Sequence, residues 1–454
     1  MKQPQTPPDF DKLFAQLMAS KRIARVLRSA AKLSVDDYMH WDDLCRHPTP
    51  PDFNHEEWWA VLKLKRKAAY RQLPLLDKAG KPFNYFIPEK IQELLHEIDF
   101  GAGAYVGMPE PIANPQTRDR YIVSSLIQEA ITSSQLEGAV TTREVAKDML
   151  RSGRSPRDDS ERMILNNFKT MQEIIRIKDQ PLTVPLLLHI HRIVTDRALK
   201  KPEAAGRFRL PDELIHVVDG EGQIFHTPPD ASELQARAEK MCAFANGQTS
   251  GPFVPPVIRA IILHFWLAYD HPFYDGNGRT ARALFYWSML HHHFWLFEFI
   301  SISNIILKAR AKYERAFLYT ENDENDLNYF ILHQADVIRR AVAALHDYLG
   351  MKQKETQQTA SRLRSLRRFN HRQQALLTHA LRHAEAEYSM ESHQTSHNIA
   401  YATARADLLG LETAGLLTRA KRGKEIFFEP TQDLEKKLES LAKKQPTPMG
   451  TEVS

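Results

Sequence analysis

The feature that most limits how this chain can fold is the helical period of its apolar residues between about Phe83 and Leu349. Apolar residues recur there every three to four positions, over long segments separated by short loops that contain Gly and Pro. The expected helices are Arg120–Thr132, Arg162–Lys178, Pro185–Thr195, Ala231–Ala245, Pro256–Tyr269 and Asn277–Leu290. Only Glu213–Val218 with Gln223–His226, joined by the turn Asp219–Gly220, has the pattern of a β-hairpin. The sequence therefore predicts a mainly α domain with one small hairpin.

Length and composition fit a globular protein of several domains. The 454 residues allow two to four domains, and 43% hydrophobic with 26% charged residues exclude a mostly disordered chain. Two cysteines, Cys45 and Cys242, are too few for a disulfide framework or a Cys-rich zinc site. The first residues lack the apolar core of a signal peptide, and the apolar stretch Ala283–Leu307 carries histidines and Glu298 that are costly in a bilayer. We therefore expect a cytoplasmic protein without a membrane span.

The pattern divides the chain into five parts. Residues 1–82 form a helical region of unknown role, residues 83–350 the main helical domain, and residues 351–369 a basic linker or helix. Residues 370–432 are expected to form three helices and a hairpin, and residues 433–454 a tail that is disordered from Thr447. All of the net charge of +5 comes from residues 351–454, which hold 17 Lys and Arg against 12 Asp and Glu. Such a basic run is most often a solvated surface, but it also suits contact with nucleic acid.

The segment His264–Leu284, HFWLAYDHPFYDGNGRTARAL, holds the residues best suited to chemistry. Its Gly-Asn-Gly at 276–278 opens an expected helix, where backbone N–H groups and the positive helix end form a cradle for an anion. Arg279 and Arg282 are expected to project from one side of the first turn toward that anion. Asp275 could hold a divalent cation that bridges phosphates, and His271 could take a proton from a nucleophile. Each feature alone is common in turns and on surfaces, but together they suit phosphoryl or nucleotidyl transfer.

Residues His271 to Arg282 match, position for position, the motif HxFx[DE]GNGRxxR, and on this basis the chain is identified as a member of the Fic family. The resemblance extends over about Phe83–Leu349. Gly206–Arg209 is similar to the family's Gly-x-x-Arg turn, and the hairpin that ends in IFHTPP at 224–229 resembles its target-binding flap. The resemblance implies a Fic-type helical domain with a small β-hairpin flap.

The resemblance also implies a reaction. AMP would pass from ATP to a Ser, Thr or Tyr hydroxyl of a target protein, and of the enzyme itself, while pyrophosphate leaves. His271 would be the general base, and Asp275 would hold Mg²⁺. The residues implied in nucleotide binding are Asp275, Gly276, Asn277, Gly278, Arg279, Thr280 and Arg282. Those implied in the target flap are Gln223, Ile224, Phe225 and His226.

A second motif lies upstream, in the hexapeptide SSQLEG at 133–138. It resembles the family's inhibitory motif [ST]xxxE[GN], with Ser133, Glu137 and Gly138 at the defined positions. The resemblance implies an autoinhibited enzyme in which Glu137 pairs with Arg282 and keeps the γ-phosphate from it. An ordinary helix end capped by Gly138 would give the same hexapeptide. In the alternative function, Glu137 would position water in the same site to remove AMP from a modified target.

Several other histidines are expected to be structural. His291, His292 and His293 follow one another on a helix and point about 100° apart, so they cannot share one metal ion well. His189 and His191 lie on a helix with a buried pattern.

The C-terminal module resembles a winged helix-turn-helix over Ser396–Leu417 and the basic hairpin that follows. In such folds the recognition helix enters the major groove and the wing contacts phosphates. The residues implied in base contacts are Thr403 and Arg405, and those implied in backbone contacts are Arg419, Lys421, Arg422 and Lys424. The same module could instead bind protein. A DNA-binding regulator whose Fic site senses nucleotide is therefore a further alternative, and a homodimer is among the assemblies that the sequence allows.

Overall fold

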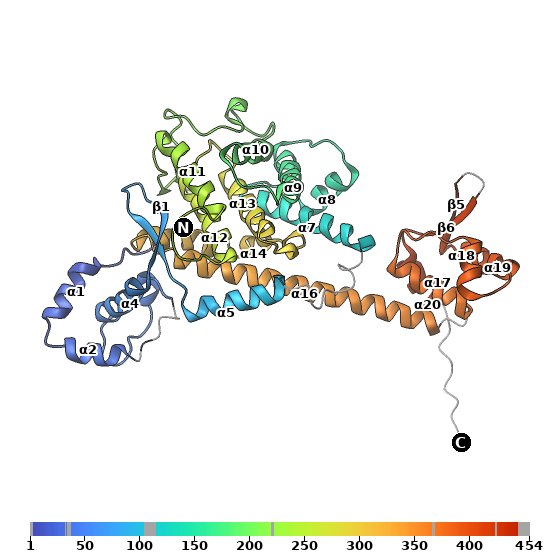
Figure 1. The fold of residues 1–454 in the computed structure, drawn as a ribbon, viewed down its shortest axis with the longest axis horizontal. Helices are drawn as coiled ribbons and strands as arrows, with labels where there is room; N and C mark the ends of the chain where they lie inside the picture. The colour runs from blue at the N-terminus through green and yellow to red at the C-terminus, as the bar shows by residue number, and fades with distance from the viewer. Residues whose placement is uncertain are drawn as a thin grey trace, which may run out of the picture. The chain divides into compact units, whose positions relative to one another are not determined.

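The computed structural model describes residues 3–31, 33, 38–103, 115–218, 222–365, 368–422 and 425–443 (Figure 1). The chain divides into two compact units. The first contains Met1–Ala104 and Ser124–Ala343, and the second contains Tyr105–Val123 and Ala344–Ser454. The predicted mainly α fold is confirmed, and the strands of the described residues form separate two-stranded antiparallel hairpins.

The first unit begins with helices that enclose an apolar core of their own, and a hairpin follows them. Asn54 and Glu57 form the capping box that starts α4, and Leu44 and Trp59 are fully buried in the core. The hairpin corrects the expectation that residues 1–82 form a helical region. Its first strand contains Pro74, which lacks the N–H that an inner strand must donate, so the segment does not have the pattern of a strand. A two-stranded sheet tolerates the proline, since each strand has an edge without a partner strand. The elements are α1 (Phe10–Ala19), α2 (Ile23–Ala30), α3 (Trp41–Leu44), α4 (His55–Ala69), β1 (Arg71–Leu76), β2 (Pro82–Tyr85) and α5 (Glu89–Ile98).

The rest of the first unit is built around α12 (Pro256–Asp270) and α13 (Asn277–His291). Almost every residue of both helices is buried, so the other helices pack around this pair. Each helix expected from the sequence is present in its predicted place. The remaining elements are α7 (Pro115–Leu136), α8 (Arg143–Ser152), α9 (Asp159–Ile177), α10 (Val184–Val194), β3 (Val217–Val218), β4 (Ile224–His226), α11 (Leu234–Ala245), α14 (Ile302–Leu307), α15 (Arg310–Asn322) and α16 (Asn328–Ser365), which continues into the second unit.

The apolar stretch Ala283–Leu307 is not one long helix. α13 ends at His291, the backbone turns at His293 with a φ of 66°, and α14 begins only at Ile302. Among the described residues, no helix is both long and apolar enough to cross a membrane.

The second unit contains the three helices and the hairpin expected for residues 370–432. They are α17 (His371–Arg382), α18 (Met390–His397), α19 (Tyr401–Thr413), β5 (Leu417–Arg422) and β6 (Glu425–Pro430). Leu377, Leu408 and Phe428 are fully buried in their shared core. A further helix, α20 (Leu434–Lys443), adds Leu434 and Leu438 to this core. The part of the expected tail beyond residue 443, including Thr447, lies outside the described residues.

A cluster of buried charges joins α4 to the segment between α15 and α16. Lys63 is 1% exposed and donates to Oδ1 of Asp323 at 2.6 Å, while Asp323 is 2% exposed. Arg66, on the same helix, donates to the Tyr329 hydroxyl at 2.8 Å and lies 3.8 Å from the centre of the Tyr38 ring. Buried charges are tolerated only when they are paired. The cluster therefore fixes the end of α15 to the N-terminal helices.

We expect Lys63→Met to lower the free energy of unfolding by about 3–5 kcal/mol, because it leaves the Asp323 carboxylate buried without its cation. Lys67→Met is the matched control, since Lys67 on the same helix pairs at 3.0 Å with Glu324, which is exposed. Exposed pairs contribute about 0–1 kcal/mol. Urea unfolding followed by tryptophan fluorescence measures both losses, because all six tryptophans lie in the first unit. Equal losses in the two variants would contradict the prediction.

Candidate functional site

The loop from α12 to α13 has a backbone shape that few residues can adopt. His271 follows α12 with a φ of 43°, in the left-handed region, and its N–H caps the helix by donating to the Leu267 carbonyl. Gly276 has a φ of 83°, and a Cβ there would come within 2.8 Å of the Thr195 side chain. Asn277 accepts from the Phe273 N–H at 2.9 Å and donates back to its carbonyl at 2.8 Å. These contacts fix the loop in one conformation.

His191 on α10 holds the loop from outside. Its Nδ1 accepts from the Gly206 N–H at 3.0 Å, its Nε2 donates to the Asp275 carbonyl at 2.9 Å, and its ring stacks on Phe273 with centres 3.7 Å apart. Burial lowers the pKa of His191 to about 4, which keeps the ring in the neutral form that this arrangement needs. The buried helical pattern predicts a structural role for His191, but the sequence does not indicate which loop it supports.

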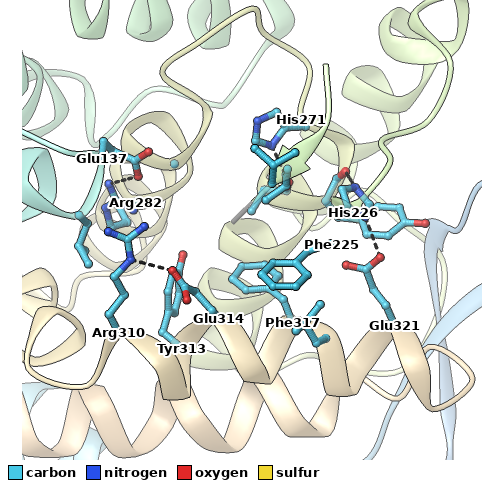
Figure 2. A pocket seen from close by; sticks show the side chains of 17 residues that line it. Glu137, Phe225, His226, His271, Arg282, Arg310, Tyr313, Glu314, Phe317 and Glu321 are labelled. Atoms are coloured by element: carbon cyan, nitrogen blue, oxygen red, sulfur yellow. Dashed lines mark hydrogen bonds and ion pairs between the residues drawn. The ribbon is translucent and has the colours of Figure 1, made fainter. Parts of the chain in front are cut away.

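His271 lines a pocket of about 550 Å³ (Figure 2). Its carbonyl accepts from Nε of Arg209 at 3.0 Å, and its ring Nδ1 lies 3.2 Å from the Ala268 carbonyl. Because a carbonyl can only accept, Nδ1 carries the proton and Nε2 keeps its lone pair. Burial lowers the pKa of His271 to about 4, so the ring is neutral at physiological pH. A neutral imidazole with an unprotonated nitrogen is able to take a proton from a nucleophile.

Glu137 and Arg282 form an ion pair in the same pocket (Figure 2). Nη2 of Arg282 donates to Oε1 of Glu137 at 2.8 Å and to the Ser133 carbonyl at 2.9 Å, while Nε donates to Oγ of Ser133 at 2.8 Å. Burial raises the pKa of Glu137, but the charge and hydrogen bond of Arg282 outweigh it and lower the pKa on balance. The structure thus brings together the residues that the sequence motif pairs, with the carboxylate ionised.

Gly278 provides the space that Glu137 occupies. A Cβ at position 278 would overlap Oε1 of Glu137 and come within 3.2 Å of Nη1 of Arg282. The carboxylate therefore lies against the first turn of α13, where backbone N–H groups and the positive helix end attract anions. Gly138, with a φ of 95°, follows directly, so the helix end that the hexapeptide also allows is present as well.

The other predicted nucleotide-binding residues are arranged less simply. Arg279 does not share a partner with Arg282, because its Nη1 donates to the Val194 carbonyl of α10 at 3.2 Å. Its Nη2 lies 3.6 Å from Oδ1 of Asp275. Thr280 is fully buried and donates to the Gly276 carbonyl at 2.9 Å, so its hydroxyl supports the helix start. The two arginines extend to different neighbouring helices, which their spacing in sequence does not indicate.

Asp275 is the residue that fits a metal ion. Its side chain is 57% exposed and lies beside the start of α13. Mg²⁺ usually binds through one or two carboxylates together with phosphate oxygens, so Asp275 suits an ion that arrives with a nucleotide. Within the described residues, no group of three or more His, Cys, Asp or Glu side chains could hold a metal ion unaided.

The flap and α15 form further walls of the pocket. β3 pairs with β4 as the sequence predicts, although the turn at 219–221 lies outside the described residues. Gln223 is exposed, Ile224 is 48% exposed, and Phe225 and His226 line the pocket. The sequence indicates no role for α15, because an amphipathic pattern does not show which residues will face a cavity. Its contributions are Arg310, Tyr313, Glu314, Phe317, Leu318 and Glu321 (Figure 2).

The predicted DNA-contact residues lie on α19 and the hairpin of the second unit. Arg405 is exposed and Thr403 is half-buried on α19. Lys421 is exposed on β5, and the exposed Arg419 donates to Oε2 of Glu412 at 2.7 Å. Arg422 ends β5, and Lys424 lies outside the described residues.

Comparison with known proteins identifies relatives of this chain. Residues 181–289 match the Fic/DOC family. The chain is 29% identical over 201 residues to protein adenylyltransferase Fic of Nematostella vectensis, covering 42% of this chain and 43% of that protein. It is 26% identical over 238 residues to protein adenylyltransferase fic-1 of Caenorhabditis elegans, covering 51% and 42%. The chain thus spans less than half the length of these two curated relatives.

A solved structure supports the fold. The crystal structure of a Fic family protein from Desulfovibrio desulfuricans G20 superposes with a TM-score of 0.51 at 18% identity, covering 77% of this chain and 98% of that one. At this identity the similarity shows the fold alone. The family match at residues 181–289 and the curated relatives together show that this chain is similar to Fic family proteins.

We expect Gly278→Ala to displace Glu137 from Arg282, because the new Cβ would overlap the carboxylate. The loss of a hydrogen bond to the buried guanidinium costs about 1.5–3 kcal/mol. In a Glu137→Gly background the same change should be neutral or stabilising, since alanine is favoured over glycine in a helix. A double-mutant cycle on the free energy of unfolding measures the coupling. Additive effects would mean that Glu137 does not occupy this space.

Proposed function

We propose that this protein is an adenylyltransferase that transfers AMP from ATP to a hydroxyl side chain of a target protein, and to itself. The observation that carries the proposal is one pocket that holds both the unprotonated Nε2 of His271 and an anion site at Arg282. Attack on a phosphate needs a base and an anion site held in fixed positions. The names of the Nematostella and Caenorhabditis relatives agree with this reaction.

In the proposed reaction, His271 takes the proton of the target hydroxyl at Nε2 while the hydroxyl oxygen attacks the α-phosphate of ATP. A new O–P bond joins AMP to the target, the bond between the α- and β-phosphates breaks, and pyrophosphate leaves. The N–H groups at the start of α13 stabilise charge on the phosphates, and Arg282 holds the γ-phosphate. Mg²⁺ on Asp275 would supply further neutralisation of the phosphate charge.

In the same proposal, Glu137 is an internal inhibitor. Its carboxylate lies where the γ-phosphate would bind and uses the same guanidinium of Arg282. ATP would then bind with its phosphates displaced, and a displacement of about 1 Å at the α-phosphate can cost on the order of 10²-fold in rate. The two hydrogen bonds from Arg282 to Ser133 hold the end of α7 in place for this contact.

We expect Glu137→Gly to raise self-labelling and target labelling with labelled ATP by about one to two orders of magnitude, the scale of that displacement cost. His271→Ala should lower transfer by about 10²–10⁴-fold while ATP still binds, because it removes the base alone. The double variant should be as inactive as His271→Ala. Incubation with labelled ATP, Mg²⁺ and cell lysate measures all three. If Glu137→Gly labels no better than the unmodified protein, Glu137 is not an inhibitor, and unchanged labelling by His271→Ala would exclude it as the base.

A second reaction at the same site is favoured by one observation, the ionised Glu137 in the pocket of His271. A carboxylate there could orient water toward the phosphate of an AMP-modified target and so release AMP. Supplying an AMP-modified protein distinguishes the two reactions. Free AMP released by the unmodified protein, but not by Glu137→Gly, would favour removal over transfer.

We further propose that the second unit binds duplex DNA through α19 and the β5–β6 hairpin, in the manner of a winged helix. The proposal is supported by the exposed Arg405 on α19 and Lys421 on β5, and by the excess of basic residues after position 350. In a winged helix, the recognition helix contacts the major groove and the wing contacts phosphates. A basic residue on α19 and basic residues on the hairpin fit this division.

We expect the full-length chain to bind duplex DNA with a log–log salt slope near −4.5, which corresponds to about five phosphate contacts. Lys421→Ala should make the slope less negative by about 0.9, because one contact is lost. Lys436→Ala, at an exposed position on α20, should leave it unchanged. A gel-shift titration over salt concentration measures these slopes. Absence of binding at low salt would instead favour protein contacts.

A further inference from the structure

His226, at the end of β4, has both ring nitrogens placed against acceptors (Figure 2). Nδ1 lies 2.7 Å from Oε2 of Glu321 on α15, and Nε2 lies 2.7 Å from the carbonyl oxygen of Tyr269 on α12. A carboxylate and a carbonyl can only accept hydrogen bonds, so each nitrogen must carry a proton. A histidine protonated at both nitrogens is an imidazolium cation. The side chain is 8% exposed, which leaves little room for water to replace either partner.

The neighbours of this ring on α12 and α15 favour a positive charge. Glu321 is an anionic partner in direct contact. The Tyr269 carbonyl belongs to the last turn of α12, which is the negative end of the helix dipole. Asp270, also on α12, adds a weaker attraction, because burial raises its pKa and Arg237 already binds it at 2.7 Å.

Two groups near the ring act in the opposite sense. His271 repels a charged His226 only when it is itself protonated, and its pKa of about 4 keeps it neutral at physiological pH. Arg209 lies beside His271 and donates to the Pro229 carbonyl just beyond the flap. Of the permanent cations named, Arg237 is paired with Asp270 and Arg209 donates to carbonyl groups, whereas the Glu321 carboxylate contacts His226 directly.

We propose that His226, as an imidazolium, is a positioning residue that fixes the flap strand β4 to the last turn of α12, directly before the base His271. The inference rests on the proposed function for its effect on transfer, because β4 is the strand that a target would meet. A neutral ring carries a proton on one nitrogen only, so it can keep only one of the two bonds. Both contacts of the flap strand, to α15 and to α12, are therefore kept only while the ring carries both protons.

The protonation state is tested directly by NMR of protein labelled with ¹⁵N-histidine, with His226→Gln used to assign the His226 signals. At pH 7 both ring nitrogens of His226 should give the shifts of protonated nitrogens. In Glu321→Gln the imidazolium signals should disappear at a lower pH than in the unmodified protein, because the stabilising charge is gone. One unprotonated ring nitrogen of His226 at pH 7 would overturn the inference.

The fixing of the flap is tested by hydrogen exchange at pH 7 over residues 222–230. Glu321→Gln should accelerate exchange there by about ten- to a hundredfold, the effect of losing a hydrogen bond to a charged group. Glu314→Gln is the matched control, since Glu314 lies on the same helix and lines the same pocket but pairs with Arg310 at 2.7 Å. Equal exchange in both variants would overturn the inference.

The link to transfer is tested by the pH profile of self-labelling with labelled ATP in the Glu137→Gly background. Labelling should fall on the alkaline side, and the fall should begin at lower pH when Glu321→Gln is added. If labelling falls at the same alkaline pH with and without Glu321→Gln, His226 does not affect the transfer. If no background labels at any pH, the proposed transfer fails, whereas the NMR and exchange results still decide whether His226 is an imidazolium that fixes the flap.

Discussion

Two hydrogen bonds between Asn277 and Phe273 hold the turn from α12 to α13, and both halves of the candidate site depend on that turn. His271, the proposed base, follows the last residue of α12, and the proposed anion cradle is the first turn of α13. Their separation is therefore set by the loop between them. This loop is largely buried, so its polar backbone needs partners, which His191 and Arg209 provide from other parts of the chain.

Much of this arrangement could be predicted from the sequence, because it depends on residues that are close together in the chain. The helices of the first unit follow from apolar periodicity, and the cradle follows from glycines and an asparagine at a helix start. The pairing of Glu137 with Arg282 joins residues 145 positions apart. No periodicity reveals such a contact, and it was predicted only through the resemblance of the hexapeptide to a family motif.

What the sequence does not reveal depends on packing between distant segments. Pro74 prevents the first hairpin from being predicted, because proline is excluded only from strands that pair with a strand on each side, and β1 has one partner strand. The residues of α15 that line the pocket could not be predicted either. A helical pattern distinguishes buried from exposed positions, but residues that line a cavity belong to neither class. Arg279 and Arg282 bind different partners for a similar reason. The partners of a long side chain depend on which helices pack nearby, and the spacing of the two arginines in sequence does not show this.

The low pKa of His271, about 4, also has a consequence for the proposed reaction. A general base works best when its pKa lies near the working pH, and burial, followed by the charges of His226 and Arg209, places the pKa of His271 well below that. The charge of Glu137 already raises the pKa of His271 slightly against this burial. A polyphosphate that replaced Glu137 at Arg282 would bring several negative charges to the same place and raise it further. In the proposed reaction the substrate would thereby make His271 a stronger base, whereas the carboxylate of Glu137, with a single charge, does so only weakly.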